Sequence, residues 1–252
     1  MKKICPECCS LNTKKNGHVR STGKQNNYCK DCGRNFSDSA NKKYISKSTK
    51  EQVRRALLER ASLRGICRIF SISLKWLVSF FIKETNKLPE DLNFNQDLAE
   101  KIHLEQLDDD TVIFCEADEL CTYVGNKKKK VWLWIALDCE TLQILAFHVG
   151  DRSKKSCKKL WDKIPISYKK KLYMFTDHLK SYKSVIPKSQ HKDVDKGSGL
   201  TSLIESFNNV LRQRLARLVR KTASFSKSEA NLVRTVHLFL VEYNLHRQLK
   251  FE

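Results

Sequence analysis

The sequence has few acidic residues and no long apolar segment. It contains 28 Asp and Glu against 48 Lys and Arg, which gives a formal net charge of +20 at pH 7. Its longest apolar runs, such as WLVSFFI at 76–82, are much shorter than the roughly 20 residues that cross a bilayer. The opening residues MKKICPECCS lack the apolar stretch of a secretory signal. We therefore expect a soluble intracellular protein that does not enter a membrane.

The excess of basic residues indicates which partners the protein binds. At a pI near 9.6, nucleic acid is the first candidate partner and an anionic membrane surface the second. The alternative is that the lysines serve only solubility. A hydrophobic content of 40% argues against wholesale disorder.

The sequence also lacks internal repeats, and its only low-complexity tract is one lysine run. The uneven distribution of charge is therefore the main guide to domains. Residues 1–50 hold 12 Lys/Arg and 3 Asp/Glu, whereas residues 86–120 hold 2 and 11. Residues 200–252 are basic again, with 9 and 4. A basic head, an acidic middle and a basic tail indicate separate modules.

The stretch ETNKLPEDLNFNQD, at 84–97, is typical of a linker because it combines Pro89 with scattered asparagines. We accordingly predict three domains, which are 1–45, 46–95 and 96–252.

Ten cysteines are present, and inside a cell they are expected to be mostly reduced. Four of them form the pattern C-x2-C-x20-C-x2-C in CPEC and CKDC; they are Cys5, Cys8, Cys29 and Cys32. Two such turns complete a tetrahedron of sulfur around Zn²⁺. Four thiolates leave no open position, so we predict a structural zinc ribbon or finger. The alternative is an accidental spacing in a cysteine-rich chain.

Residues 48–84 show helical periodicity in three successive apolar stripes. Ser71-Ile72-Ser73 interrupts the pattern, and Ser73 is a candidate N-cap. Short helices with a tight turn before the last favour a helix-turn-helix, whose last helix enters the major groove of DNA. Lys75 would then face the groove. The alternative is a helical linker without DNA contacts.

The pattern changes from residue 111 onward. TVIFCEAD, VWLWIALD at 131–138 and LQILAFHVG at 142–150 have the lengths and apolar content of buried strands. A helix is expected near 154–163, and then a fourth strand that ends at Asp177. The segment 200–222 places its leucines and Phe207 at helical spacing. The sequence thus predicts an α/β domain.

Three acidic residues in this domain attract attention. Asp118 lies on the first predicted strand, Asp177 ends the fourth, and Glu205 lies beside the apolar stripe of the last helix. Converging carboxylates repel one another unless a cation neutralises them, and hard oxygen ligands suit Mg²⁺ or Mn²⁺. Two such ions support phosphodiester chemistry. The alternative is that Asp177 caps a turn and Glu205 is a solvated helix residue; the roles of Glu116 and Glu119 stay open.

Four consecutive lysines, Lys127, Lys128, Lys129 and Lys130, follow the first acids. They would hold DNA around a metal centre. The alternative is a solvated hairpin tip.

Nearly end to end, the chain resembles transposases of the IS-one insertion-sequence family, of the InsA–InsB type. The segments that carry the resemblance are CPEC with YCKDCGRNF, SLRGICRIF, EADELCTYVGNKKKKVWLW, ILAFHVGDRS, FTDHLKSY and GLTSLIESFNNVLRQRLARLVRKTASFSKS. The last segment is the most specific.

The resemblance implies a ribonuclease-H-like catalytic domain of the DDE class, with Asp118, Asp177 and Glu205 as its acids. Arg212, seven positions after the glutamate, would bind a phosphate near the cut, and Arg214 and Arg217 are further candidates for DNA contact. The implied reaction cuts at the terminal inverted repeats of the element and joins 3′-OH ends to target DNA. It implies a homodimer or higher oligomer on DNA in the prokaryotic cytoplasm, associated with the nucleoid. Ser206 stands where the family commonly has arginine.

Two other functions fit parts of the sequence. One is a non-enzymatic DNA-binding regulator built on the zinc site and the helix-turn-helix, which would not need the acids. The other is a tyrosine recombinase, because Tyr243 lies near His246 and Arg247 in VEYNLHRQ. Neither the sequence of the element ends, the target preference nor the activity of this copy follows from the residues.

Overall fold

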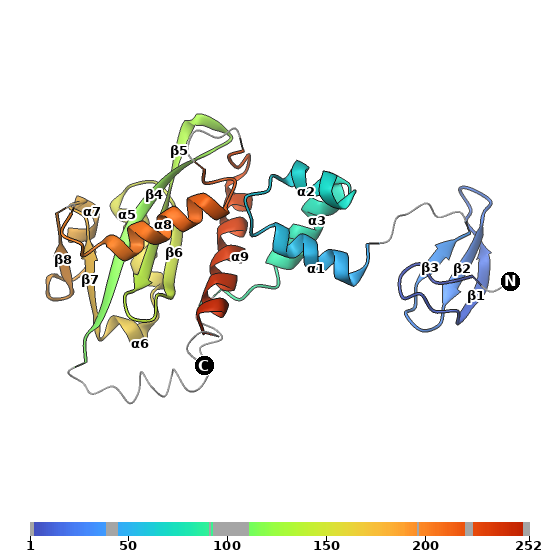
Figure 1. Cartoon of the computed structure of the whole chain (residues 1–252), viewed down its shortest axis with the longest axis horizontal. Coiled ribbons are helices and arrows are strands. Elements are labelled where there is room, and N and C mark those ends of the chain that lie inside the picture. Colours follow the sequence, from blue (N-terminus) through green and yellow to red (C-terminus); the bar gives the residue numbers. More distant parts are fainter. Residues whose placement is uncertain are drawn as a thin grey trace. The chain divides into compact units, whose positions relative to one another are not determined.

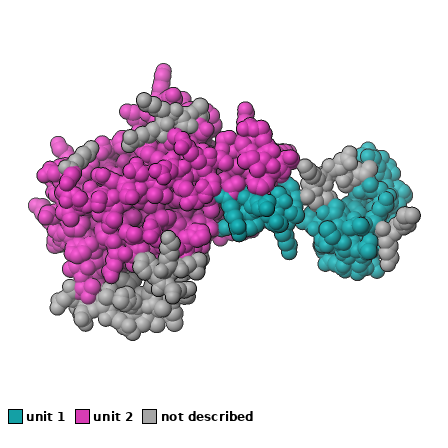
Figure 2. Space-filling view, in the orientation of Figure 1, with its two compact units in different colours: residues 1–55 teal, residues 56–252 magenta. Residues whose placement is uncertain are grey.

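The computed structural model describes residues 3–38, 45–90, 92, 111–195, 197–219 and 224–248. The chain forms two compact units, residues 1–55 and 56–252 (Figure 2). Residues 91 and 93–97 of the predicted linker, and with them the boundary expected after residue 95, lie outside the described residues. The division into three domains stays a prediction.

The first unit holds a small antiparallel sheet in the order β1-β2-β3 and a following helix (Figure 1). The elements are β1 (Thr13–His18), β2 (Gln25–Cys29), β3 (Asn35–Ser37) and α1 (Lys47–Ala56). Among the described residues, the buried apolar cluster of this sheet consists of Cys5, Cys29 and Phe36. So small an apolar core leaves the sheet dependent on another source of stability.

The second unit begins with the predicted helix-turn-helix, which is confirmed. Its helices are α2 (Leu63–Phe70) and α3 (Leu74–Thr85), and the two are bent by 111°. Ser73 caps α3 as predicted, since its side chain accepts a hydrogen bond from the N–H of Trp76. Ser62 caps α2 in the same way. Ser71 adopts a φ of 49° in the turn, a position where glycine is more usual.

No single helix among the described residues is long and apolar enough to cross a membrane. In the part of the chain that the structure describes, α2 and α3 together have the length and apolar content for a span, but they meet at a bend of 111°.

The rest of the second unit is built on a five-stranded sheet in the order β6-β5-β4-β7-β8. The strands are β4 (Ile113–Val124), β5 (Asn126–Asp138), β6 (Ile144–Gly150), β7 (Leu172–Thr176) and β8 (His191–Asp193). The first three are antiparallel neighbours, whereas β7 runs parallel to β4 and β8 parallel to β7. A meander of three strands extended by two parallel strands is the ribonuclease-H-like arrangement, so the predicted α/β fold class is confirmed.

Helices cover both faces of this sheet (Figure 1). They are α5 (Lys154–Lys163), α6 (Ile166–Lys169), α7 (Lys180–Lys183), α8 (Ser202–Arg214) and α9 (Glu229–Gln248), with a 3-10 turn at Lys188–Gln190. Buried residues of α5, α6 and α7 pack in one apolar cluster with Cys115 and Ala117 of β4. Glu116 and Asp118 alternate with these and contact α8 on the other face.

The helix predicted at 200–222 is shorter than expected. α8 ends at Arg214, and Leu215 is already extended, with φ −102° and ψ 109°. Leu215 and Leu218 nevertheless stay buried, so the apolar spacing continued beyond the helix. The Arg212 guanidinium donates to the carbonyl of Leu218 over 3.0 Å, which holds the turned chain against the helix that it leaves. By contrast, α5 has the bounds predicted for it.

Candidate functional site

Asp118 and Asp177 are brought level with each other by the parallel pairing of β4 and β7. Their register aligns Cys115 with Met174 and Glu116 with Phe175, so continuing it by two residues aligns Asp118 with Asp177. Asp118 accepts a hydrogen bond from the Asn208 amide over 2.8 Å. Asp177 accepts one from the N–H of Leu179 over 2.9 Å, so it does cap a turn, as the alternative interpretation expected.

β7 ends at Thr176, and the sheet therefore opens beside β4 at this level. Residues that alternate between the two faces of β4, namely Ala117, Asp118, Glu119 and Leu120, all line the cavity there. Carboxylate oxygens of Asp118, Glu119 and Asp177 lie within 4.8 Å of one another. Glu119, whose role the sequence left open, is thus the third acid of the tightest group.

Burial and mutual repulsion act on this group. Burial is the main cause that raises the pKa of Asp118, and the charge of Asp177 adds to it. Burial likewise raises the pKa of Glu119 to about 7, together with the charge of Asp177 and against the lowering effect of Arg152. Carboxyl groups whose pKa values are raised by burial and by neighbouring carboxylates are common at functional sites.

Arg152 is the cation in contact with two of these acids. Its Nε donates to Glu119 Oε1 over 3.1 Å, and its Nη2 lies 3.6 Å from Asp177 Oδ2. The guanidinium carbon lies 4.6 Å from the ring centroid of Trp132, so the side chain packs over this ring of β5. Sequence patterns gave no signal for Arg152, because it follows the end of β6 and reaches the acids only in the folded sheet.

Glu205 lies on the first turn of α8 and lines the same cavity of about 470 Å³, with Asp118, Asp177 and Arg212. It is exposed and is not part of the group of oxygens within 4.8 Å. Thr201 Oγ1 donates to its Oε1 over 3.4 Å. The three predicted acids therefore face one cavity, with two in close proximity and Glu205 on the wall.

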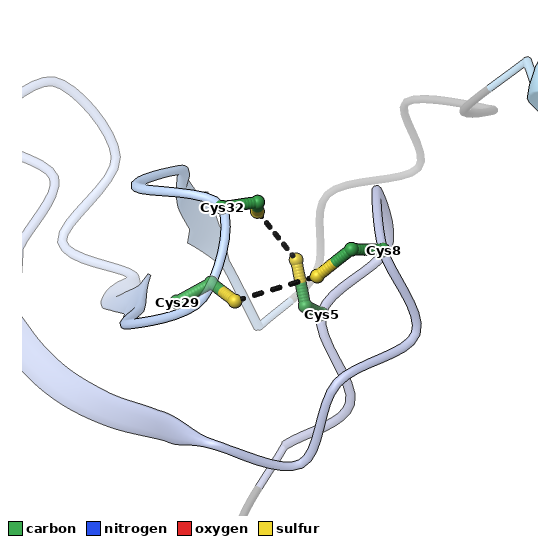
Figure 3. Close-up of side chains that lie close together, drawn as sticks. All are labelled: Cys5, Cys8, Cys29 and Cys32. Carbon is green, nitrogen blue, oxygen red and sulfur yellow. Dashed lines mark hydrogen bonds between the residues drawn. The ribbon is translucent and has the colours of Figure 1, made fainter.

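The four predicted zinc ligands also converge (Figure 3). Their sulfurs lie within 4.8 Å of one another, and Cys5–Cys32 and Cys8–Cys29 are each separated by 3.5 Å. Bonds of about 2.3 Å to a tetrahedral zinc ion would separate sulfurs by roughly 3.8 Å, so the cluster fits zinc closely. All four are free thiols rather than disulfides.

Both turns of the cysteine cluster are built alike. The N–H of Cys9 donates to the carbonyl of Cys5, and the N–H of Gly33 donates to that of Cys29. Cys9 and Gly33 both have positive φ, at 59° and 71°. Cys9 therefore occupies the position that glycine occupies in the second turn, and its sulfur is not one of the four that converge.

Comparison with known proteins bears on the acidic centre of the sheet. The family model described as IS1 transposase matches residues 112–244, which include Asp118, Asp177, Glu205 and Arg212. The chain belongs to the IS1 transposase family.

Relatives of this transposase include the insertion element iso-IS1n protein InsB of Shigella dysenteriae, which is 36% identical over 117 residues, 46% of this chain and 85% of that protein. The insertion element IS1 4 protein InsB of Escherichia coli (strain K12) is 33% identical over 47% of this chain and 68% of its own length. The crystal structure of a pre-cleavage Mos1 transpososome aligns with 80% of this chain and 77% of that chain, but at 6% identity and a TM-score of 0.30.

In the transposase, Glu116 caps the helix that carries Glu205. Its Oε2 accepts a hydrogen bond from the N–H of Ile204 over 2.7 Å, across 88 positions of the sequence. Thr201, the residue at the cap position of α8, makes no such side-chain bond. Burial raises the pKa of Glu116, and the N–H groups of Ile204 and Leu203 offset only part of that rise. A carboxylate on the neighbouring strand thus replaces the usual local cap.

We expect Glu116→Ala to lower the free energy of unfolding by about 1–2 kcal/mol, because it removes the acceptor for the first turn of α8. Urea denaturation of the full chain measures the change. Glu116→Gln keeps an acceptor oxygen and should lose less; equal losses for both variants would mean that the hydrogen bond to Ile204 contributes nothing.

Arg212 lines the cavity, but its guanidinium also holds the backbone. Besides the bond to Leu218, its Nη2 donates to the carbonyl of Cys121 over 3.5 Å. The predicted contact with phosphate stays a prediction.

The predicted DNA-binding residues lie in different settings. Lys75 is exposed on α3, and Lys127, Lys128, Lys129 and Lys130 are exposed along the first part of β5. Lys129 lies 3.7 Å from Glu229. Arg214 pairs with Glu59, and the Arg217 guanidinium donates to Ser226 over 2.8 Å. The two arginines therefore already have protein partners, whereas the lysine run forms the exposed start of β5 beside the turn at Gly125, as the alternative of a solvated hairpin tip also expects.

Tyr243 of the transposase is part of the packing between α8 and α9. Its ring centroid lies 4.7 Å from that of Phe207, and its hydroxyl accepts a hydrogen bond from Arg247. These contacts account for the Tyr–Arg pair that prompted the recombinase interpretation.

Proposed function

We propose that this chain is a DDE-type DNA transposase that binds the terminal inverted repeats of its element, cuts there and joins the 3′-OH ends to target DNA. The observation that carries the proposal is that Asp118, Asp177 and Glu205 line one cavity of a ribonuclease-H-like sheet. Membership of the IS1 transposase family supports it independently.

The three acids would hold Mg²⁺ or Mn²⁺, since they offer only hard oxygen ligands around a cavity that phosphate oxygens can enter. Bound ions of this kind activate a nucleophile and stabilise the leaving oxygen of a phosphodiester. Asp118 is oriented by a hydrogen bond from Asn208, and Asp177 by one from the N–H of Leu179. Both carboxylates are thus held in position before an ion binds. Water would attack in the cutting step and the freed 3′-OH in the joining step.

The basic surface would hold the DNA around this centre. Lys75 on α3 suits the major groove, and Lys127–Lys130 suit phosphates beside the cavity strand. Arg212 would contact a phosphate near the cut, and Arg214 and Arg217 would lie close to the DNA path. Because two DNA ends have to be joined, we propose a homodimer or a higher oligomer on DNA.

The cysteine cluster would bind one zinc ion with a structural role, because four thiolates leave no position for a substrate. Lys14, Lys15 and Lys24 are exposed on this small unit and would contact phosphates.

The direct experiment incubates the purified full chain with Mg²⁺ and DNA that carries the ends of its element. We expect single-strand cuts at the ends and joined products on a sequencing gel. DNA binding without any cutting would favour the regulator instead, above all if a chain that stops at residue 95 binds equally well.

The lysine run gives a quantitative test of the DNA interface. Replacing Lys127–Lys130 by alanine should weaken binding and reduce the slope of log K against log salt by up to about 0.9 for each phosphate that a lysine no longer neutralises. Titrations by fluorescence anisotropy at several salt concentrations measure the slope.

Four other exposed lysines provide the matched control, at Lys154, Lys155, Lys158 and Lys159 of α5. Their replacement removes the same charge and should leave the slope nearly unchanged. If both quadruple variants lower the slope alike, the lysine run contributes only net charge and does not bind the DNA at a defined position.

A further inference from the structure

Glu119 is a carboxylate on the apolar face of its strand. It pairs across the strands with the buried Trp134, and its side chain has no exposed surface. Its neighbours in sequence on that face, Ala117 and Cys115, belong to the apolar core. Burying a charged group at such a position is costly unless something neutralises it.

Arg152 neutralises Glu119 only in part. It engages Oε1, whereas Oε2 is buried and has no hydrogen-bond partner among the described residues. The same guanidinium also lies against Asp177. Within the part of the chain that the structure describes, Arg152 thus contacts two of the three carboxylates, Glu119 and Asp177, and one buried oxygen of Glu119 has no hydrogen bond.

The position of the three carboxylates fits a shared cation. Two oxygens bound to the same Mg²⁺ at about 2.1 Å lie at most about 4.2 Å apart. The oxygens of Asp118, Glu119 and Asp177 lie within 4.8 Å of one another without an ion, so small movements of side chains suffice. Glu205, by comparison, stands on the cavity wall outside this group.

We infer that Glu119 supplies a further oxygen to the divalent cation held by Asp118 and Asp177, an inference that rests on the proposed function. When the ion binds, the unsatisfied Oε2 gains a partner and Arg152 keeps its bond to Oε1. Glu119 thereby links the ion to Arg152 and to the apolar face of the sheet, while Glu205 completes the site from α8.

The competing explanation is that Glu119 serves only to hold Arg152 in place. Calorimetric titration of the full, zinc-loaded chain with Mn²⁺, without DNA, separates the two. We expect Glu119→Gln to weaken Mn²⁺ binding at least about tenfold. Arg152→Gln should bind Mn²⁺ no more weakly than the unaltered chain, because it removes a cation that competes for Asp177.

The remaining variants fix the interpretation. The double variant Asp118→Asn/Asp177→Asn should lose the site, so any Mn²⁺ that it still binds is bound elsewhere. Asp138 is a buried acid that does not line the cavity, and Asp138→Asn should therefore bind Mn²⁺ as the unaltered chain does. Glu119→Asp keeps the charge on a shorter side chain and should retain more binding than Glu119→Gln, which keeps the test valid if glutamine disturbs the fold.

Unchanged affinity in Glu119→Gln would overturn the inference, and so would equal weakening in Glu119→Gln and Arg152→Gln. The proposed function fails in a different way: the unaltered chain would then bind no Mn²⁺ at the site, or the double variant would bind it as well as the unaltered chain.

Discussion

Asp118→Asn and Asp177→Asn are each expected to lower the rate of DNA cutting by at least about a thousandfold. A divalent ion supplies several kcal/mol of stabilisation to the transition state of phosphodiester cleavage, and each 1.36 kcal/mol is a factor of about ten. Both carboxylates line the cavity, and both have other hydrogen-bond partners that keep an asparagine in place. Cutting of end-labelled DNA that carries the element ends measures the effect. Glu205→Gln should act in the same direction.

The affinity for DNA should not fall in these variants, because the proposed role of the acids is to hold metal ions and not to contact phosphates directly. Anisotropy titrations are expected to give similar affinities for both variants and the unaltered chain. Asp138→Asn is the matched control: this acid is buried at the end of β5, where it accepts hydrogen bonds from the N–H groups of Glu140 and Thr141. If Asp138→Asn loses cutting as completely as Asp118→Asn does, the loss reflects damage to the sheet rather than to the metal site.

Removing zinc is expected to unfold the cysteine-bearing segment at residues 3–38. The buried apolar cluster of its sheet holds Phe36 and two of the cysteines, which is too small to stabilise three short strands. A structural zinc ion contributes on the order of 10–16 kcal/mol in small zinc domains. Cys5→Ser combined with Cys29→Ser should therefore abolish zinc binding and the amide protection of β1 and β2. Elemental analysis and hydrogen exchange measure the two effects.

Cys9→Ser separates the role of the four ligands from that of cysteine content. Cys9 adjoins Cys8 in the sequence, but its sulfur is not one of the four that lie within 4.8 Å of one another. The variant should retain one zinc ion per chain and full amide protection. Equal loss of zinc in Cys9→Ser would show that the ligand set has been assigned wrongly, whereas protection that survives in the double variant would show that the segment folds without metal.

Local patterns predicted much of the fold. The first apolar stripe lies on and just after α1, and the other two lie on α2 and α3. The break at Ser71-Ile72-Ser73 and the cap at Ser73 appear in the turn between α2 and α3. The apolar runs became β4 to β7, and the helix at 154–163 has the predicted bounds. Capping, periodicity and run length act over a few residues, so a sequence records them directly. The same logic failed beyond Arg214, where leucines at helical spacing stay buried although the helix has ended.

Some of the acids could be assigned from the sequence, whereas others needed the tertiary structure. Asp118, Asp177 and Glu205 stood out through the pattern of residues around them and through the family resemblance, and they do line one cavity. Glu116 and Glu119 could not be separated by strand alternation alone. Glu116 points to α8, which it caps from 88 positions away, and Glu119 points to the apolar face, where Arg152 meets it. These partners come from elements that the sequence does not place side by side.

The sequence by itself determined the basic charge, the four cysteines with the spacing of a zinc site, the helix-turn-helix and the acids that carry the family resemblance. Only the tertiary structure decided which carboxylates share a centre, because that depends on the register of β4 against β7 and on where β7 ends. Strand pairing joins residues almost sixty positions apart, and no periodicity within either strand encodes it. The end of β7 then lets both faces of β4 meet in one cavity, which makes Glu119 a neighbour of Asp118 in space as well as in sequence.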